Sequence, residues 1–450
     1  MVTTSLATTA KKHIPFVYGL PFIGSQRSLK NDRLNFMISL AQKGEIYGFY
    51  LGPTPCILLS KPELIHMAYV EHAHELPTRG SRMNKNPTTN GLLKMEAESH
   101  RKRRKFLAPN LHPRQVSHYA DSITQYGEQL QQQWKDGTVI SLHQQMSSLS
   151  INIMGKILFG VDSLAADDEF VDALAAMLEL GAKKVFKPFE WPANWPAPIN
   201  RQLNKVRQRI QNGSQRMLRQ RSGNGDDLLS VLQQPTSDDG SQMSRQEAMN
   251  ECRELLFAGH DTVALSLIWT WFLLSQHPDI YQKVQQEIDQ VLEGRTPQYA
   301  DLERLPYCLQ VYKEAIRIRP PVPFTRREAS SDFEIDGYPI PKGTIVFISP
   351  YIMHHKAEYF PEPERFDPER FSPAREKEIP RYAYIPFGTG PRTCIGNHLV
   401  MMEGHLLLAT LAQRVTFELL PGQKDEFNLK TSMSLSPVGK VEAVVKRRQP

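Results

Sequence analysis

The chain has 450 residues, of which 40% are hydrophobic and 9% aromatic, so it can bury a large core. Lysine and arginine number 54 against 48 aspartates and glutamates, and the net charge of +6 is too small for a dedicated nucleic-acid binder. The cysteines lie far apart without a CxxC pair, which argues against a zinc site or disulfide framework and indicates a reducing compartment. They are Cys56, Cys252, Cys308 and Cys394.

The N-terminal stretch MVTTSLATTAKKHIPFVYGLPFIG contains no long apolar run. It lacks the basic start, the apolar middle and the small-residue cleavage site of a secretory signal. We therefore expect a cytoplasmic protein without a transmembrane anchor. Residues 1–20 are expected to form a disordered extension ahead of the folded chain.

Strand signals are few and short, whereas long segments favour helix. The runs that predict strands are IYGFYLG at 46–52, CILLS at 56–60, TIVFIS at 344–349 and VEAVV at 441–445. Polar, glutamine-rich runs predict solvent-facing helices at 122–134 and 276–292. We expect a mainly α fold with a small β region (α+β), and not an alternating βαβ array.

Three further segments are distinctive in composition. The basic run RKRRK at 101–105 is, taken alone, a solvated charged face. The stretch VFKPFEWPANWPAPIN at 185–200 contains too many prolines to form one helix. The polar stretch QQPTSDDGSQM at 233–243 predicts a loop before the next helix.

A long helix is predicted from Ser244, which has the S-x-x-E spacing of a capping box with Glu247, to Pro278, which stops it. Its segment LLFAGHDTVALSLIWTWFLL at 255–274 has about the length of a bilayer core. Such a helix is either a membrane span or the central helix of a large core. Asp261 would cost about 2.5–3.5 kcal/mol in mid-membrane, and no second such segment exists, so the core helix is favoured.

Ala258-Gly259-His260-Asp261-Thr262 interrupts this apolar run. A helical threonine can bond the carbonyl one turn back, and a glycine lets another group approach the backbone closely. An acid and an alcohol here can relay protons into a dry cavity, or they can mark a kink with a solvated acid. The segment alone leaves both interpretations open.

Three short motifs follow. Glu314 and Arg317 in VYKEAIRIRPP are spaced i, i+3, which alone indicates a surface salt bridge, and FDPERF at 366–371 indicates a turn. The stretch PFGTGPRTCIG at 386–396 surrounds Cys394 with glycines, which allow sharp turns and close approach. A buried structural cysteine would leave this glycine pattern unexplained.

Taken in order, AGHDT, ExxR, PERF and FGTGPRTCIG resemble the motifs of the cytochrome P450 family, the haem-thiolate monooxygenases, from about Pro21 to the C-terminus. The family signature F-G-x-G-x-R-x-C-x-G is met at every fixed position of 387–396. The resemblance implies a single domain over 21–450 that uses O2. It also implies haem b (iron protoporphyrin IX) ligated by Cys394, whose thiolate favours O–O cleavage.

The same resemblance assigns roles to other positions. His100 and Arg104, in which His replaces the commoner Trp, match a pair that binds a haem propionate. Arg392 and Arg327 match further propionate partners, with the adjacent Arg326 as the alternative to Arg327. The other positions implied to contact haem are Ala258, Phe387 and Gly396, and those implied to line the substrate pocket are Ala258, Val322, Pro323 and Phe324.

Two more groups carry over from the family. Asp261 and Thr262 match the pair that delivers protons to iron-bound dioxygen, which peroxide-using relatives replace. Glu314, Arg317 and Arg370 match a buried Glu-Arg-Arg triad with a structural role. The alternative is a haem-thiolate protein that is not a monooxygenase, such as an isomerase or a sensor, and the retained acid–alcohol pair favours the monooxygenase.

The resemblance defines substrate and partners only by class. It implies lids at about 78–93 and 186–199, the second of which has an apolar mouth made by Phe186, Phe189, Trp191 and Trp195. A lipophilic substrate is expected, such as a fatty acid or a terpenoid, although most ligand sites are apolar. Electrons from NAD(P)H are expected through separate proteins, a ferredoxin or flavodoxin and its reductase. The chain looks bacterial with microsomal-type motifs, and we expect a monomer.

The basic run acquires a second interpretation from the resemblance. At 100° per residue, His100 and Arg104 share one side of a helix, and Arg101, Lys102 and Lys105 fall on the opposite side. The family places this helix beside the cysteine face, where acidic redox partners dock. We therefore expect the three exposed cations to steer such a partner, with a solubilising charged face as the alternative.

Overall fold

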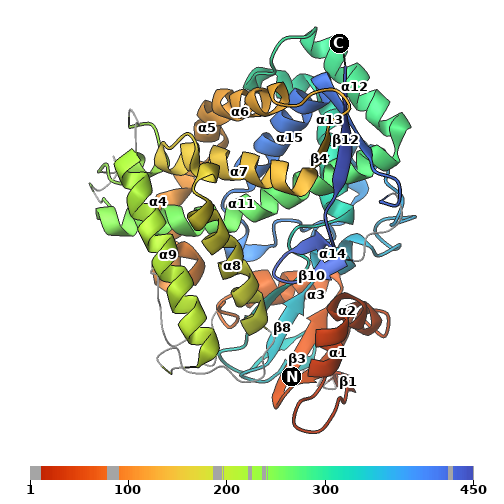
Figure 1. Cartoon of the computed structure of the whole chain (residues 1–450). Coiled ribbons are helices and arrows are strands. Elements are labelled where there is room, and N and C mark those ends of the chain that lie inside the picture. The colour runs from red at the N-terminus through yellow and green to blue at the C-terminus, as the bar shows by residue number, and fades with distance from the viewer. Residues whose placement is uncertain are drawn as a thin grey trace, which may run out of the picture.

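The computed structural model describes residues 12–78, 91–185, 195, 197–220, 225–235, 240, 242–423 and 429–448. Helices make up a large body, and most strands lie in a smaller region at one side of it (Figure 1). The predicted mainly α fold with a small β region is therefore confirmed.

The helices of the large body include the two that the polar runs predict, α6 and α12, each within two residues of its expected bounds. The helices are α4 (Ala97–Leu107), α5 (Pro113–Val116), α6 (Ala120–Gln132), α7 (Leu142–Phe159), α8 (Asp168–Val185), α9 (Pro198–Gln220), α10 (Leu228–Val231), α11 (Arg245–Gln276), α12 (Pro278–Leu292), α13 (Pro306–Ile318), α14 (Pro350–His354) and α15 (Asn397–Arg414). The strand-rich region adds α1 (Gln26–Asn31), α2 (Arg33–Ala41) and α3 (Pro62–His66).

Short helical turns connect these elements. One is a π-helical turn, η1 (Met67–Glu71), which continues α3. The others are 3₁₀ turns: η2 (Leu92–Lys94), η3 (Ala108–Leu111), η4 (Ser117–Tyr119), η5 (Leu164–Ala166), η6 (Tyr299–Arg304), η7 (Pro368–Phe371), η8 (Glu376–Glu378) and η9 (Gly390–Arg392).

Five strands form the main sheet, and all four predicted strands are found in the structure. The main sheet has the order β1 (Phe16–Val17), β2 (Ile46–Leu51), β3 (Thr54–Leu59), β8 (Ile345–Ile348) and β5 (Thr325–Glu328). A second sheet has the order β4 (Val139–Ser141), β12 (Glu442–Arg447) and β9 (Val415–Leu419). Two hairpins complete the set, β6 (Phe333–Ile335) with β7 (Tyr338–Ile340), and β10 (Leu429–Thr431) with β11 (Leu435–Pro437).

The alternation of side chains along β3 produces two separate apolar layers. Ile57 and Leu59 face one side, where they pack with Ile65 of α3. Cys56 and Leu58 face the other side and pack with α1 and α2. The main sheet is therefore covered by helices on both faces, which explains why its strands are apolar runs.

The segment before residue 21 corrects one expectation. Phe16 and Val17 form β1 and pair in parallel with Gly48 and Phe49 of β2. The expectation of disorder is wrong for this stretch, because the open edge of β2 supplies hydrogen-bond partners to its backbone. Residues 1–11 lie outside the described residues.

Helix α11 crosses the middle of the molecule (Figure 1) and packs against α7, α13 and α15. It begins with the predicted capping box, in which Ser244 Oγ accepts from Glu247 N and the Glu247 carboxylate accepts from Ser244 N. Within the described chain it is the one helix long and apolar enough to span a membrane, and 67% of its most apolar window is buried in the protein. It is the central core helix that the sequence favours.

Candidate functional site

The loop that carries Cys394 is a compact turn that needs two of its glycines. Gly388 and Gly390 have φ of 70° and 73°, in the left-handed region that favours glycine. A Cβ on Gly390 would lie 2.0 Å from the carbonyl oxygen of Tyr69 in η1, so this glycine also permits close packing. The loop is closed by Cys394 N, which donates to the Phe387 carbonyl at 2.9 Å.

Cys394 faces a cavity of about 400 Å³ between this loop, α15 and α11. Its side chain has a large accessible surface although it lies deep in the protein, because that surface faces the cavity. Ten of the predicted site residues line the same cavity. They are His100, Arg104, Ala258, Thr262, Val322, Arg327, Phe387, Arg392, Cys394 and Gly396.

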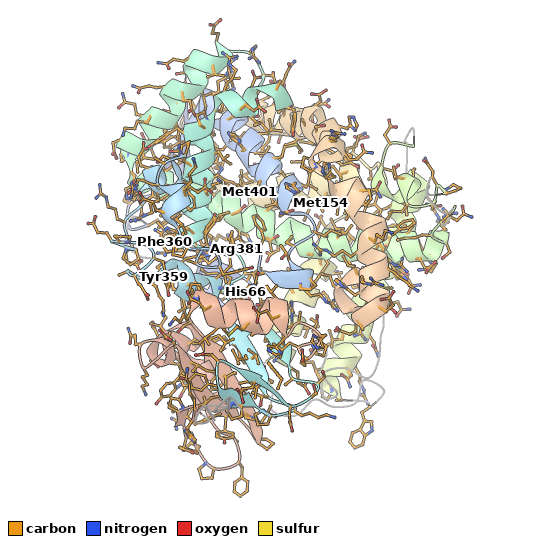
Figure 2. The ribbon with its side chains drawn as sticks, turned by 180° about the vertical axis from the view of Figure 1, so that it is seen from behind. His66, Met154, Tyr359, Phe360, Arg381 and Met401 are labelled. Atoms are coloured by element: carbon orange, nitrogen blue, oxygen red, sulfur yellow. The ribbon has the colours of Figure 1, made fainter. Side chains whose placement is uncertain are left out.

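Helix α11 supplies one wall of the cavity through Ala258, Gly259 and Thr262. Thr262 Oγ1 donates to the Ala258 carbonyl at 2.9 Å, which is the predicted bond to the preceding turn. A Cβ on Gly259 would lie 2.8 Å from the methyl carbon of Met154, so α7 packs closely here (Figure 2). α11 nevertheless continues as one α-helix, and the AGHDT segment interrupts its hydropathy but not its secondary structure.

Basic side chains from three parts of the chain gather at one side of the cavity. They are His100 and Arg104 of α4, Arg327 of β5 and Arg392 of the cysteine loop. Arg392 forms an ion pair with Glu96 at 2.6 Å. Burial and the charges of the three arginines lower the pKa of His100 to about 4. Burial is the larger cause of this fall, and the three arginines that add to it place positive charge at this side of the cavity.

Strand alternation decides between the two candidate arginines of β5. Arg327 lines the cavity and lies over the ring of Tyr69, 5.4 Å from its centroid. The charge of Arg326 acts instead on Arg33 and Cys56, which belong to the α1 and α2 side of the sheet. Arg327 is thus the arginine that can reach a molecule in the cavity.

The residues around the cavity fit haem. Among the described residues, no three metal-binding side chains come together, so Cys394 is a single donor and suits a metal whose other ligands belong to a macrocycle. Gly396 lines the cavity and leaves open space where a Cβ would stand, so a flat group can lie against it. The basic cluster suits the two carboxylates of such a group.

Glu314, Arg317 and Arg370 come together as a buried network away from the cavity. Arg317 donates to both Glu314 oxygens at 2.6 and 2.9 Å, and Arg370 donates to Glu314 at 3.3 Å. Glu314 and Arg317 are fully buried, so the pair is not the surface salt bridge that its spacing alone indicates. The network joins α13 to η7, and none of its members lines the cavity.

Of the residues predicted to deliver protons or to line the substrate pocket, three do not line the cavity. Asp261 is partly buried one position before Thr262, on a neighbouring face of α11. Pro323 is buried and its carbonyl accepts from Ser349 Oγ at 2.8 Å, while Phe324 packs against the clusters around α2. Neither residue lines this cavity, and the ring of Phe324 is instead used in packing between the main sheet and its neighbours.

The expected lids fall largely on residues 79–90 and 186–194, outside the described residues. At the edges of the first lid, Thr78, Leu92 and Leu93 line the cavity. Phe186, Phe189 and Trp191 of the apolar mouth are not described, and Trp195 is 53% exposed. Whether the second lid forms an apolar mouth can be tested by measuring ligand binding.

Helix α4 presents the two sides that its sequence predicts. His100 is buried, whereas Arg101, Lys102 and Lys105 are exposed. Arg101 and Lys105 also line a second cavity of about 820 Å³, which shares His100, Arg104 and other basic residues with the first. The exposed cations of α4 therefore lie next to the basic side of the site.

Sequence reasoning missed three acids that line the cavity, Glu251 and Glu254 on α11 and Glu403 on α15. Glu251 and Glu254 precede Ala258 at helical spacing, so they share its face, and this spacing was the available signal. Burial raises the pKa of Glu403 to about 8. Its available signal was an acid inside the apolar run LVMMEGHLLLATLA.

Comparison with known proteins agrees with this geometry. The family model described as Cytochrome P450 matches residues 14–444. Cyclooctatin synthase of Streptomyces melanosporofaciens is 32% identical over 96% of this chain and 96% of its own length. Cyclooctat-9-en-7-ol 5-monooxygenase of the same organism is 30% identical over 90% of this chain and 89% of its own. Pentalenene oxygenase of Streptomyces avermitilis is 27% identical over 89% of this chain and 90% of its own. The chain is an oxidoreductase of the cytochrome P450 family.

Proposed function

We propose that this chain inserts one oxygen atom of O2 into a neutral lipophilic substrate, with haem held by Cys394. The observation that carries the proposal is the position of Cys394, in a glycine-rich loop facing the same cavity as Ala258 and Thr262 of α11. Haem, when bound, supplies the activation of dioxygen. The protein's own residues bind the cofactor, position the substrate and move protons.

Two groups beside Cys394 favour the ionised thiol that an iron ligand requires, against the larger effect of burial. Burial raises the pKa of Cys394, and the backbone N–H of Gly396 and the charge of Arg104 oppose this rise. His100, Arg104, Arg327 and Arg392 would hold the propionates, since these side chains concentrate positive charge at one side of the cavity. Phe387 and Gly396 would contact the flat face of the cofactor.

Proton delivery is assigned to Thr262 and Asp261. The Thr262 hydroxyl lines the cavity while it donates to Ala258 and Gly259 carbonyls, and rotation of its O–H lets it donate to an oxygen atom in the cavity. Asp261 is partly buried and does not line the cavity, so it would bring a proton to Thr262 by turning its side chain. This division of roles fits an acid that exchanges protons with solvent and an alcohol that passes them on.

The cavity lining favours a neutral substrate over a fatty acid. Glu251 and Glu254 lie about 10 Å and about 6 Å along α11 from Ala258 and line the cavity among leucines and Met154. Among the described residues that line this part of the cavity none is basic, so a substrate carboxylate would have no cation to pair with there. The substrate names in two relatives, cyclooctat-9-en-7-ol and pentalenene, are those of an unsaturated alcohol and an unsaturated hydrocarbon. We therefore propose a terpenoid hydrocarbon or alcohol as the substrate class.

Electrons are proposed to come from NAD(P)H through a reductase and an acidic ferredoxin or flavodoxin that docks on α4. The support is the exposed group Arg101, Lys102 and Lys105 beside the basic side of the site. A cytoplasmic location is supported by four free cysteines, of which Cys56, Cys252 and Cys308 are buried. The monomeric state stays a prediction.

The test uses the haem-loaded protein and visible spectroscopy. The reduced carbon-monoxide complex should have the band of a thiolate-ligated haem, and Cys394→Ser should lose it while Cys56→Ala keeps it. Neutral terpene alcohols and hydrocarbons should change the iron spin state at lower concentrations than fatty acids of similar size. A thiolate band in Cys394→Ser contradicts the ligand, and tighter binding of fatty acids contradicts the substrate class.

A further inference from the structure

The first half of α11 carries two acids that contact a different element. Glu251 and Glu254 are one turn apart, and both are buried. Glu251 Oε2 accepts from the backbone N–H of Leu92 at 3.0 Å, and Glu254 Oε2 accepts from that of Leu93 at 3.1 Å. The side chains of α11 thus bind the backbone of η2, whose two leucines line the cavity.

These bonds replace a cap that η2 does not have. The first N–H groups of a helical turn have no partner within the turn. The N-cap of η2 is Gly91, which has no side chain to accept from them. Glu251 and Glu254 therefore supply the cap from another helix, and both acceptors are carboxylates, which form the stronger class of hydrogen bond.

Arg103 extends the contact to α4. Its guanidinium lies 3.3 Å from Glu251 Oε1 and 3.1 Å from Glu247 Oε1, and its side chain is only 13% exposed. Lys94 of η2 lies 3.8 Å from Glu254. The charges of the two buried acids are thereby balanced, and α4, η2 and α11 are joined beside the cavity.

Gly91 is required by this arrangement and not by its backbone conformation. Its φ of −94° is open to any residue. A Cβ at this position would lie 2.4 Å from the carboxyl carbon of Glu254. Because the obstacle is the end of a flexible side chain, Gly91→Ala can be accommodated by moving that carboxylate away from Leu93.

We propose that Glu251 and Glu254 are positioning residues that hold Leu92 and Leu93 at the cavity and so set the bulk of the molecule it accepts. The inference rests on the proposed haem site, since it concerns substrate fit at that site. Both acids act through the backbone of η2. Their removal should therefore loosen the wall without altering the residues around Cys394.

The proposal includes a dependence on pH. Burial raises the pKa of Glu251 to about 7, against the opposing effects of the Leu92 N–H and Arg103. The charged groups facing it in the described chain are Arg103 of α4, Lys94 of η2, and Glu247 and Glu254 of α11. Above this pKa Glu251 is ionised and holds both Leu92 and Arg103, and below it the hold weakens. The fit of bulky ligands should therefore weaken as pH falls from 8 to 6.

The first measurement compares two nitrogen ligands of haem iron, imidazole and the bulkier 4-phenylimidazole, by difference spectroscopy. In Glu251→Ala and Gly91→Ala, the dissociation constant for 4-phenylimidazole should rise about tenfold, because the loosened wall fits a bulky ligand less well. The dissociation constant for imidazole should stay within about twofold of wild type. Glu251→Gln is neutral at every pH and lacks the charge that faces Arg103, so it should bind 4-phenylimidazole as the wild type does at pH 6. The ratio of its dissociation constant to that of wild type cancels protonation of the azole. This ratio should fall toward one as pH drops from 8 to 6, because the wild type then loses the charge of Glu251.

The second measurement is amide hydrogen exchange in a peptide that covers residues 91–96, which needs no bound haem. Exchange should accelerate in Glu251→Ala and Gly91→Ala, and not in Glu98→Gln, a surface control on α4. If hydrogen exchange and azole affinities are both unchanged in Glu251→Ala and Gly91→Ala, the proposal is overturned. If wild-type protein gives no azole spectrum, the haem assignment fails, and exchange still decides the role of Glu251. If Glu251→Ala does not fold, Gly91→Ala decides.

Discussion

Residues adjacent in this sequence have different surroundings, and the chemistry of the site depends on the difference. Thr262 lines the cavity, whereas Asp261 does not. Arg327 reaches the cavity, whereas the charge of Arg326 acts on the other side of the sheet. In a helix, 100° separates neighbours, and in a strand they face opposite sides. A motif therefore specifies a pair of residues, and the element in which it lies decides which member meets the substrate.

The proton-delivery pair can be tested by coupling. Thr262→Ala and Asp261→Asn should each lower product formed per NAD(P)H on the order of tenfold and raise peroxide release, because protons no longer reach the bound oxygen in time. Thr270→Ala is the matched control. Thr270 donates to the carbonyl four residues before it in the same way but does not line the cavity. Equal coupling in all three variants would reduce the pair to a structural feature of α11.

At the scale of elements, α4 separates two functions by its faces. The buried face carries His100 to the cavity, and the exposed face carries Arg101 and Lys102, whose side chains are 79% and 78% exposed. Arg101 also forms an ion pair with Glu98 at 2.8 Å, so part of its charge is balanced within the helix. Exposed charges like these contribute mainly to the rate of encounter with a partner and are screened by salt.

The triple variant Arg101→Glu, Lys102→Glu and Lys105→Glu should slow reduction by an acidic ferredoxin about tenfold or more at low salt. The difference should shrink as ionic strength rises, since screening acts over about 10 Å at 0.1 M. Reduction is followed by stopped-flow spectroscopy. The control changes three cations of α9 with the same net charge, Arg201, Lys205 and Arg219. Equal slowing in both triple variants would make the effect one of net charge and not of docking on α4.

The elements themselves were largely predictable, because their signals are local. The capping box of Ser244 and Glu247, the apolar run of α11 and the short apolar strands depend on neighbours in sequence. The loop around Cys394 was predictable from its motif. Glu251 and Glu403 were missed because only tertiary contacts bury an acid at those positions. The packing of Phe324 was missed because its partners lie on α2, α14 and β11, which its own sequence does not reveal.

At the scale of the whole molecule, buried neutral histidines link stability to pH. His354 and His355 lie near the Glu314 network, and His405 of α15 lies 2.9 Å from the Leu305 carbonyl. Burial lowers the pKa of His355 to about 3 and that of His405 to about 4. At these histidines the folded state therefore binds fewer protons than the unfolded state. Their contribution to stability should be fully present above pH 6.5 and should fall as pH drops toward 4.

His405→Gln isolates one part of this loss. Between pH 7 and pH 4, the free energy of unfolding should fall by up to about 3 kcal/mol less in this variant than in wild type. The reason is that the variant lacks a group whose pKa is 6.5 in the unfolded state and about 4 in the folded state. Denaturant unfolding at several pH values measures the difference. His118→Gln, at an exposed position of η4, is the control and should follow wild type. If the two variants lose equal stability on acidification, protonation of His405 does not drive the loss.

The ion pair between Arg392 and Glu96 joins residues 296 positions apart, and the cavity needs both ends of this interval. During synthesis at about 5–20 residues per second, the ribosome takes roughly 15–60 s to cover it. From the time residue 276 is added, the nascent chain carries the apolar surface of α11 but not yet the loop that completes the pocket. Cofactor loading is therefore a late event in the synthesis of the chain, and until then the apolar wall of the site lacks its closing loop.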